Sequence, residues 1–208
     1  MEFLWKGAVE MADYTIIADI SAYILQHLRE EMCPSLITSP SGLEITSPVE
    51  QNRDCVLGLY LYDIQEEGEI ASPPMRRSGQ TMMRRISKPY TLHYMIFVNG
   101  SSQSGMKNQD MLKVVGRAAQ VVNDMESVLP NTLQPWLEQG EPPVTLFPAR
   151  LKLEDKVRVW QAVDKPYGLS LFYRASPVFL SSKIALEVPR VREASFTLLP
   201  PEEGGRGS

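Results

Sequence analysis

The chain has 208 residues, of which 43% are hydrophobic and 22% are charged, a composition typical of a soluble globular protein. Its formal net charge of -4 argues against a nucleic-acid-binding protein, because proteins that bind phosphates usually carry a basic surplus. The two cysteines, Cys33 and Cys55, have neither CxxC spacing nor paired histidines nearby, which argues against a structural zinc site. We expect both to be ordinary reduced cysteines.

The N-terminal segment contains an apolar patch of only a few residues before Lys6. A signal peptide needs an apolar stretch of about 7–15 residues, and a membrane-spanning helix needs about 20. We therefore expect a soluble protein that is made in the cytoplasm and has no membrane partner. Residues 1–11 are expected to form an N-terminal arm in front of the folded domain.

The first predicted element is a helix over residues 15–32. Its apolar residues recur at three- and four-residue steps and therefore form one stripe: Ile17, Ile20, Ile24 and Leu28. Asp13 can cap the start of this helix by accepting hydrogen bonds from free backbone N–H groups. Pro34 fits a helix that has just ended.

Three stretches predict the main strands of a sheet. Residues 55–64 (CVLGLYLYDI) are apolar on both alternating faces, as in a strand buried on two sides in the middle of a sheet. Residues 90–98 (YTLHYMIFV) are rich in aromatic and branched side chains, and residues 167–180 contain the alternating run GLSLFYRA. Residues 43–46 predict a short strand. Residues 144–151 predict an edge strand, since Pro148 cannot donate a hydrogen bond to a sheet.

Two further helices are predicted after the second main strand. The first covers residues 108–128, and its expected core stripe is Leu112, Val115, Ala119 and Val122. The second covers residues 153–163, where Val157 and Trp160 are expected to point inward. Between the first two main strands, we expect residues 65–89 to form a long irregular loop, a feature that is usually functional or disordered.

The order of these elements is helix, strand, strand, helix, strand, helix, strand. It predicts an α+β fold with a single sheet, mainly antiparallel or mixed, flanked by helices. We expect this domain to span residues 12–180. Residues 181–208 are expected to form an extended C-terminal arm, interrupted at Pro189, with a last short strand over residues 196–199 and a disordered end.

The sequence contains no motif for catalysis, cofactor binding or metal binding. It lacks a G-x-S-x-G nucleophile elbow, a G-x-x-x-x-G-K-[ST] phosphate loop and a G-x-G-x-x-G dinucleotide fingerprint. We expect structural roles for both histidines, His27 and His93, with a hydrogen bond for His93 at an edge of the sheet. A cluster of acidic residues lacks the spacing of a cation-binding loop and favours a solvated turn: Asp63, Glu66, Glu67 and Glu69. We therefore expect no enzyme activity, no cofactor and no metal.

The segment after these acidic residues is strongly basic. It carries five cations within thirteen residues and no acid: Arg76, Arg77, Arg84, Arg85 and Lys88. A solvated, mobile loop and a clamp for an acidic protein surface both fit this pattern, since arginine forks pair well with carboxylates. Nucleic acid is disfavoured as a partner because no aromatic residues interleave with the arginines. Together with Phe196 and Leu198 of the C-terminal arm, these cations are the candidate protein-interface residues.

Three stretches together resemble the tail-cap, or tail-terminator, family of contractile injection systems, whose shared region is catalogued as a domain of unknown function. CVLGLYLYDI is similar to the family's leucine–tyrosine strand, and KPYTLHYMIFV resembles its proline-led strand with a histidine–tyrosine pair, here His93 and Tyr94. The most specific stretch is LKLEDKVRVWQAVDKPYGLSLFYRASPVFL. It resembles the family's leucine-rich helix with its tryptophan, here Trp160, followed by a proline–tyrosine turn, here Pro166 and Tyr167.

The resemblance implies a fold like that of phage tail terminators and a structural, non-catalytic function. Family members are expected to form a six-fold ring that closes the end of the inner tube and sheath distal from the baseplate, so that polymerisation stops at a defined length. The implied partners are further copies of the chain, the tube subunit and the sheath subunit. The chain would be made in the cytoplasm and become part of a contractile particle.

The residues alone leave other classes of function open. One is a small monomeric adaptor that uses the basic loop to hold an acidic protein partner. A second is a nucleic-acid-associated protein that uses the same arginines, and the last is an enzyme of an unrecognised type. The mass of the chain in solution separates the ring from the monomeric adaptor.

Overall fold

The computed structural model describes residues 14–50, 54–68, 75–78, 82–85, 89–99, 107–137, 142–180 and 185–187. The chain divides into two compact units. The body unit comprises Met1–Pro73 and Ser87–Ser181, and the small unit comprises Pro74–Ile86 and Ser182–Ser208. The body unit contains almost all of the predicted elements.

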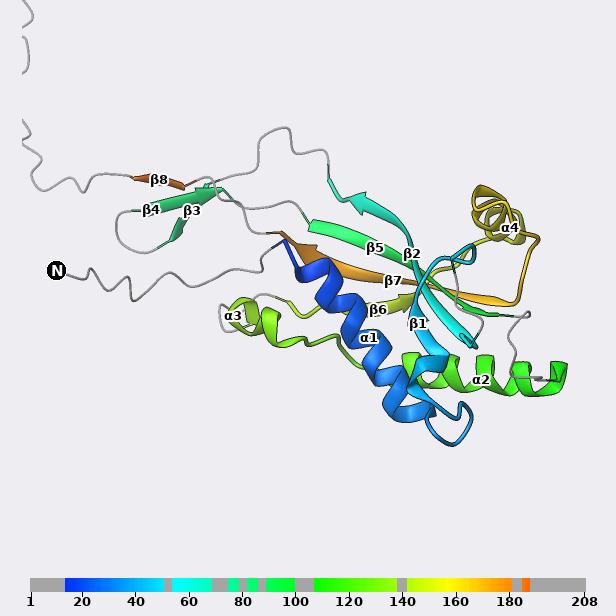
Figure 1. Cartoon of the computed structure of the whole chain (residues 1–208). Coiled ribbons are helices and arrows are strands. Elements are labelled where there is room, and N and C mark those ends of the chain that lie inside the picture. The colour runs from blue at the N-terminus through cyan, green and yellow to red at the C-terminus, as the bar shows by residue number, and fades with distance from the viewer. Residues whose placement is uncertain are drawn as a thin grey trace, which may run out of the picture. The chain divides into compact units, whose positions relative to one another are not determined.

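The body unit is built on a mixed sheet of five strands in the order β1-β2-β5-β7-β6 (Figure 1). The strands are β1 (Leu43–Ile45), β2 (Leu57–Glu66), β5 (Pro89–Val98), β6 (Thr145–Pro148) and β7 (Ser170–Phe179). β1 runs parallel to β2, and all other neighbouring pairs in this sheet are antiparallel. The predicted α+β fold with a mainly antiparallel, mixed sheet is confirmed.

The centre of the sheet is buried on both faces. Every residue of β5 from Tyr94 to Val98 is buried, so neither face of this strand is left to solvent. β2 is an interior strand, as predicted, but it is fully buried only from Leu57 to Leu59 and is exposed from Asp63 onward. The apolar run therefore predicted the position of β2 correctly and overestimated how much of it is covered.

Two helices, α1 (Ile16–Met32) and α2 (Asn108–Asp124), cover one face of the sheet (Figure 1). The predicted stripe of α1 is confirmed, with Ile17 only partly buried. The predicted stripe of α2 was wrong in part, because the helix buries the neighbouring row: Val114, Ala118, Val121 and Val122. Leu112 is instead 60% exposed. Two adjacent rows of this helix are apolar, and only packing selects the one that faces the sheet.

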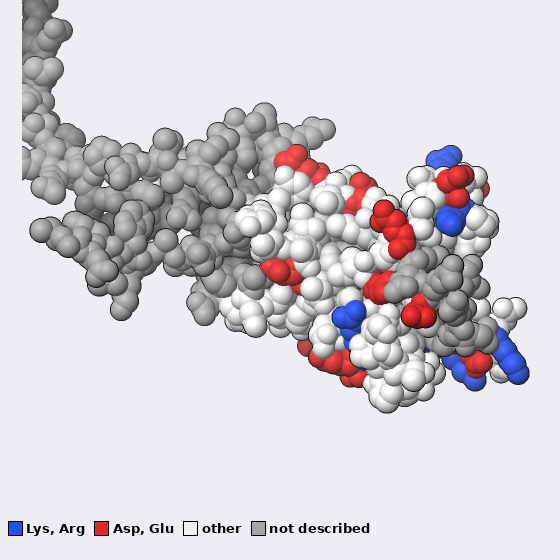
Figure 2. Space-filling model, viewed as in Figure 1, with Lys and Arg blue, Asp and Glu red and all other residues white. Residues whose placement is uncertain are grey.

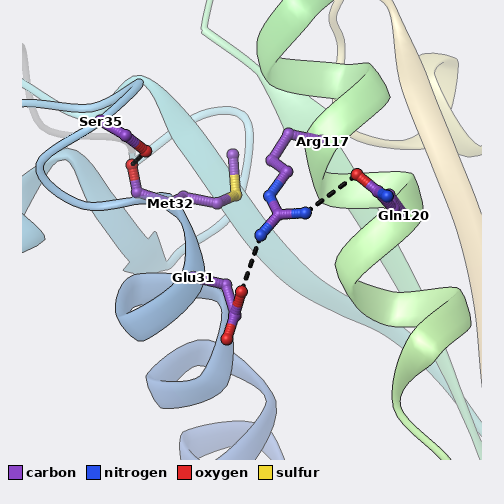
Figure 3. A network of polar contacts seen from close by, with 5 residues as sticks. All are labelled: Glu31, Met32, Ser35, Arg117 and Gln120. Carbon is purple, nitrogen blue, oxygen red and sulfur yellow. Dashed lines mark hydrogen bonds and ion pairs between the residues drawn. The ribbon is translucent and has the colours of Figure 1, made fainter.

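Polar contacts at the surface also join α1 to α2 (Figure 3). Arg117 donates hydrogen bonds to Glu31 Oε2 at 2.7 Å and to Gln120 Oε1 at 2.9 Å. The Ser35 hydroxyl donates to the carbonyl of Met32 at the end of α1. An ion pair this exposed contributes about 0–1 kcal/mol to stability, so the buried core holds the two helices together.

The predicted N-terminal cap of α1 by Asp13 is not tested by the structure. Asp13 lies outside the described residues. Thr15 occupies the capping position, and its side chain makes no capping hydrogen bond. The cap by Asp13 therefore stays a prediction.

The other face of the sheet carries α4 (Leu153–Ala162) (Figure 1). Trp160 anchors this helix: its ring lies edge-on to Phe97 with a centroid distance of 5.8 Å, and its Nε1 donates to Ser170 Oγ at 3.1 Å. The inward position predicted for Trp160 is confirmed, whereas Val157 is only half-buried. The body unit therefore has a large core under α1 and α2 and a smaller, aromatic one under α4.

One buried hydrogen bond links α1 to the central strand. The Ser21 hydroxyl donates to the carbonyl of Ile17, so the 2.8 Å contact between Ser21 Oγ and Tyr94 OH has the tyrosine as donor. Burial, the largest influence on this group, raises the pKa of Tyr94 to about 12. Because the folded-state pKa lies above the unfolded value near 10, this group's stabilisation is lost as the pH rises from about 10 to 12.

The packing of Phe97 predicts the effect of adding a methyl group at Gly58. The two residues are paired across β2 and β5, and a Cβ at Gly58 would overlap the Phe97 ring. Gly58→Ala should lower the free energy of unfolding by about 1–3 kcal/mol, measured by urea denaturation. The control is Gly116→Ala on α2, where no atom lies within 4 Å of the new Cβ and a gain of about 0.5–1 kcal/mol is expected. Equal effects at both positions would contradict this packing.

The buried hydroxyl pair predicts non-additive mutations. Ser21→Ala should cost about 1–3 kcal/mol, because the Tyr94 O–H is then buried without an acceptor. Adding Tyr94→Phe to Ser21→Ala should recover part of this loss, since the orphaned donor is removed as well. Urea unfolding of both single variants and the double variant measures the coupling. Strictly additive costs would show that the two hydroxyl groups do not depend on each other.

Candidate protein-interaction surface

The basic segment forms part of a second sheet, which belongs to the small unit. Its strands β3 (Met75–Ser78), β4 (Met82–Arg85) and β8 (Ala185–Glu187) are antiparallel in the order β3-β4-β8. The predicted irregular loop over residues 65–89 was therefore wrong for these two hairpin strands. They are short and contain Met and Arg rather than β-branched residues, and β4 pairs with a strand far along the chain, so no local pattern predicted them.

The four arginines predicted as interface residues all lie in the β3–β4 hairpin. The register pairs Arg76 directly with Arg84, whereas Arg77 is paired with Met83 and Arg85 with Met75. Directly paired residues lie on the same face of a sheet, where like charges opposite each other are unfavourable. Residues 70–90 contain no Asp or Glu, so the hairpin itself brings no neutralising charge.

The remaining predicted interface residues are not placed by the structure. Lys88, Phe196 and Leu198 lie outside the described residues, as does the strand predicted over residues 196–199. In this region the sequence pattern predicted only an extended arm interrupted at Pro189, and β8 was not predicted as a strand. β8 brings Leu186 and Glu187 to the hairpin, opposite Met83 and Met82 respectively.

The edges of the five-stranded sheet offer little backbone to a further strand. β6 is an edge strand, as predicted, and it ends at Pro148, which has no N–H group. Beside it, the carbonyl of Val144 already accepts a hydrogen bond from Val128 at 2.8 Å. β1 has only three residues, and Arg29 donates to the carbonyl of Leu43 at 2.7 Å. A partner of the body unit therefore has to bind side chains rather than extend this sheet.

The residues considered for chemistry do not converge on a reactive site. In the parts of the chain that the structure describes, no three His, Cys, Asp or Glu side chains come close enough to hold a metal ion. Both cysteines are free, and burial raises the pKa of each thiol, that of Cys55 to about 11. A thiol with a raised pKa is a poor nucleophile at neutral pH. None of the described helices is long and apolar enough to cross a membrane.

His93 corrects one prediction. It lies on β5, an interior strand, because β7 continues the sheet beyond it, so the expected hydrogen bond at a sheet edge was wrong. Its buried Nε2 atom has no hydrogen-bond partner, and its ring is 5.9 Å from that of Tyr62. His27 lies half-buried on α1, and the two histidines are on separate elements.

The acidic cluster also differs from its prediction. Asp63 and Glu66 lie on the exposed end of β2 rather than in a turn, and Glu67 follows directly. Glu67 accepts hydrogen bonds from the hydroxyl groups of Thr91 and Ser176, so it helps to fix the ends of neighbouring strands. Glu69 lies outside the described residues. These contacts give Glu67 a structural role.

Comparison with solved structures identifies two proteins that share this fold. The sheath/tube terminator of the PVC extracellular contractile injection system, in its extended state, matches with a TM-score of 0.61 and 16% identity. That match covers 90% of this chain and 65% of the other. The tube-terminating cap of the anti-feeding prophage matches with a TM-score of 0.55 and 18% identity, over 87% of this chain and 61% of the other. The chain therefore spans less than two thirds of the length of either protein.

Comparison with families and curated proteins gives two further findings. No curated protein sequence matches the chain significantly. Residues 16–193 match a family described as the Pvc16 N-terminal domain. This match includes all of the helices and strands described above, in both units. The chain therefore belongs to the Pvc16 N-terminal domain family.

Proposed function

We propose that the chain is a cap, or terminator, subunit of a bacterial contractile injection system. Six copies form a ring that closes the end of the tube and sheath distal from the baseplate and stops their polymerisation. The observation that carries this proposal is the fold, which matches a sheath/tube terminator over 90% of this chain and a tube-terminating cap over 87%. Both of those proteins are named for ending a tube or sheath, which supports a function without catalysis.

The proposed partners follow from the geometry of a capped tube. A ring needs contacts between copies of the chain that are head-to-tail and close on themselves. The last layer of a polymer presents unoccupied binding surfaces, which a terminator covers, so the tube subunit and the sheath subunit are the other two partners. The chain spans only part of the length of the two solved terminators, so we propose each of these contacts for this chain rather than transfer it from those proteins. The chain is made in the cytoplasm and assembled there into the particle.

Most of the candidate interface residues belong to the basic segment within the cap domain, and the others belong to the C-terminal arm. Residues 12–180 form the cap domain, flanked by an N-terminal arm of residues 1–11 and a C-terminal arm of residues 181–208. The candidate side chains for contacts with protein partners, among which the two faces of the hairpin remain to be distinguished, are Arg76, Arg77, Arg84, Arg85, Lys88, Phe196 and Leu198. Support comes from the hairpin, whose register concentrates arginines without an acidic residue between them.

A monomeric adaptor is the second candidate function. The positive charge of the hairpin supports it independently of the family, since arginines in a hairpin that has no acidic residue of its own suit an acidic protein partner. In this alternative, the chain stays monomeric at all protein concentrations and binds its partner with one-to-one stoichiometry. Native mass spectrometry of the chain, alone and with tube and sheath subunits, separates the two functions.

A cap function predicts the effect of deleting the chain. Particles from a strain that lacks it should have tubes or sheaths of uncontrolled length, or none intact, because nothing stops polymerisation at the last layer. Electron microscopy measures the distribution of particle lengths, and expression of the full chain from a plasmid is the control that should restore it. Intact particles of normal length in the deletion strain would rule out the cap.

A further inference from the structure

The two units of the chain carry opposite net charges. Among the 208 residues, the small unit contains 8 of the 21 basic residues and 4 of the 25 acidic ones, a net charge of +4. The body unit therefore has 13 basic and 21 acidic residues, a net charge of -8. Figure 2 shows Asp and Glu at several places on the visible face of the described residues. The chain therefore divides its charge between a basic unit and an acidic unit.

The register divides the small sheet into two different faces. Residues alternate between the faces along each strand, and directly paired residues share a face. One face, which we name the docking face, holds positions Met75, Arg77, Met83, Arg85 and Leu186. The opposite face holds positions Arg76, Ser78, Met82, Arg84, Ala185 and Glu187. Each face has two arginines, but the docking face has three larger apolar residues and no acid.

The composition of the docking face is that of a protein-binding surface. A sheet of three strands is stable when an apolar face is covered. Interfaces between proteins are enriched in Met and Arg and combine an apolar centre with polar groups at the rim. Arginine at the rim favours a partner that presents carboxylates, because the guanidinium fork binds them through two parallel hydrogen bonds. The face therefore fits an acidic protein surface that also offers apolar contacts.

We infer that the docking face of one copy binds the acidic body unit of the next copy around the ring. The inference rests on the proposed ring function. A head-to-tail ring requires two different surfaces on each copy that complement each other, and the charges of +4 and -8 supply such a pair within one chain. The contact is made by side chains, because both edges of the five-stranded sheet are poor acceptors for another strand.

The two faces provide a matched pair of variants. Arg77→Ser with Arg85→Ser alters the docking face, and Arg76→Ser with Arg84→Ser alters the opposite face; each pair removes two positive charges from one hairpin. Long-range attraction therefore weakens equally in both, and only the short-range contact differs. In particles assembled with tube and sheath subunits, the docking-face pair should reduce the number of capped ends by about tenfold, and the opposite-face pair by less than about twofold. Electron microscopy counts the capped ends.

Two results of this experiment overturn the inference: equal losses from the two pairs of substitutions, or a larger loss from the opposite face. Arg77→Lys with Arg85→Lys keeps the charge but removes the guanidinium fork, so it should retain more capped ends than the serine pair and fewer than the unaltered chain. Uncapped particles made with the unaltered chain would instead overturn the proposed cap function, so the two failures can be told apart.

Cross-linking identifies the partner directly. A photo-reactive residue at position 83 lies on the docking face, and one at position 82 lies on the opposite face of the same strand. Particles are assembled from equal parts of ¹⁴N- and ¹⁵N-labelled chains, so that mass spectrometry separates links between copies from links within one copy. Position 83 should yield links to the body unit of another copy, and position 82 should not. Links confined to one copy, or made only to tube, sheath or nucleic acid, overturn the inference.

Discussion

The antiparallel pairing of β5 with β2 and β7 places Tyr94, Ile96 and Val98 against one core and Met95 and Phe97 against another. A strand that is apolar on both sides cannot lie at a surface, so each face of the sheet needs a cover. α1 and α2 supply one cover and α4 supplies the other. Local details follow from this double burial. Gly58 leaves space for the Phe97 ring, and Trp160 completes the aromatic core beneath α4.

A sheet covered on both faces leaves its edges and its surface charges for contact with other proteins. At the β6 edge, Pro148 has no N–H group and Val144 is already paired with Val128. At the other edge, β1 has only three residues and the carbonyl of Leu43 already accepts a hydrogen bond from Arg29. Charged and apolar side chains on the surface are then the remaining means of recognition. The chain separates its charges strongly, with a net charge of -8 on the body unit and +4 on the small unit. Such a division suits a subunit that repeats head-to-tail.

The described residues include no group of three or more His, Cys, Asp or Glu that could hold a metal ion. The thiols have raised pKa values, the carboxylates at the end of β2 are exposed or fix strand ends, and the two histidines lie on separate elements. The two solved proteins that share the fold are a sheath/tube terminator and a tube-terminating cap. The proposed function thus depends on surfaces and on the fold, and the register of the small sheet places different residues on its two faces.

Hydrophobic periodicity in the sequence determined the elements of the body unit. The doubly apolar runs gave β2 and β5, the stripe of Ile20, Ile24 and Leu28 gave α1, and Pro148 identified an edge strand, because each of these signals is local. Three outcomes were decided only by the tertiary structure. It selects the apolar row of α2 that faces the sheet, and it pairs β8 with the basic hairpin. It also places β7 beside β5, so that His93 lies on an interior strand. Each of these outcomes depends on residues distant in the chain, and a local pattern contains no information about which distant segment will pack beside it.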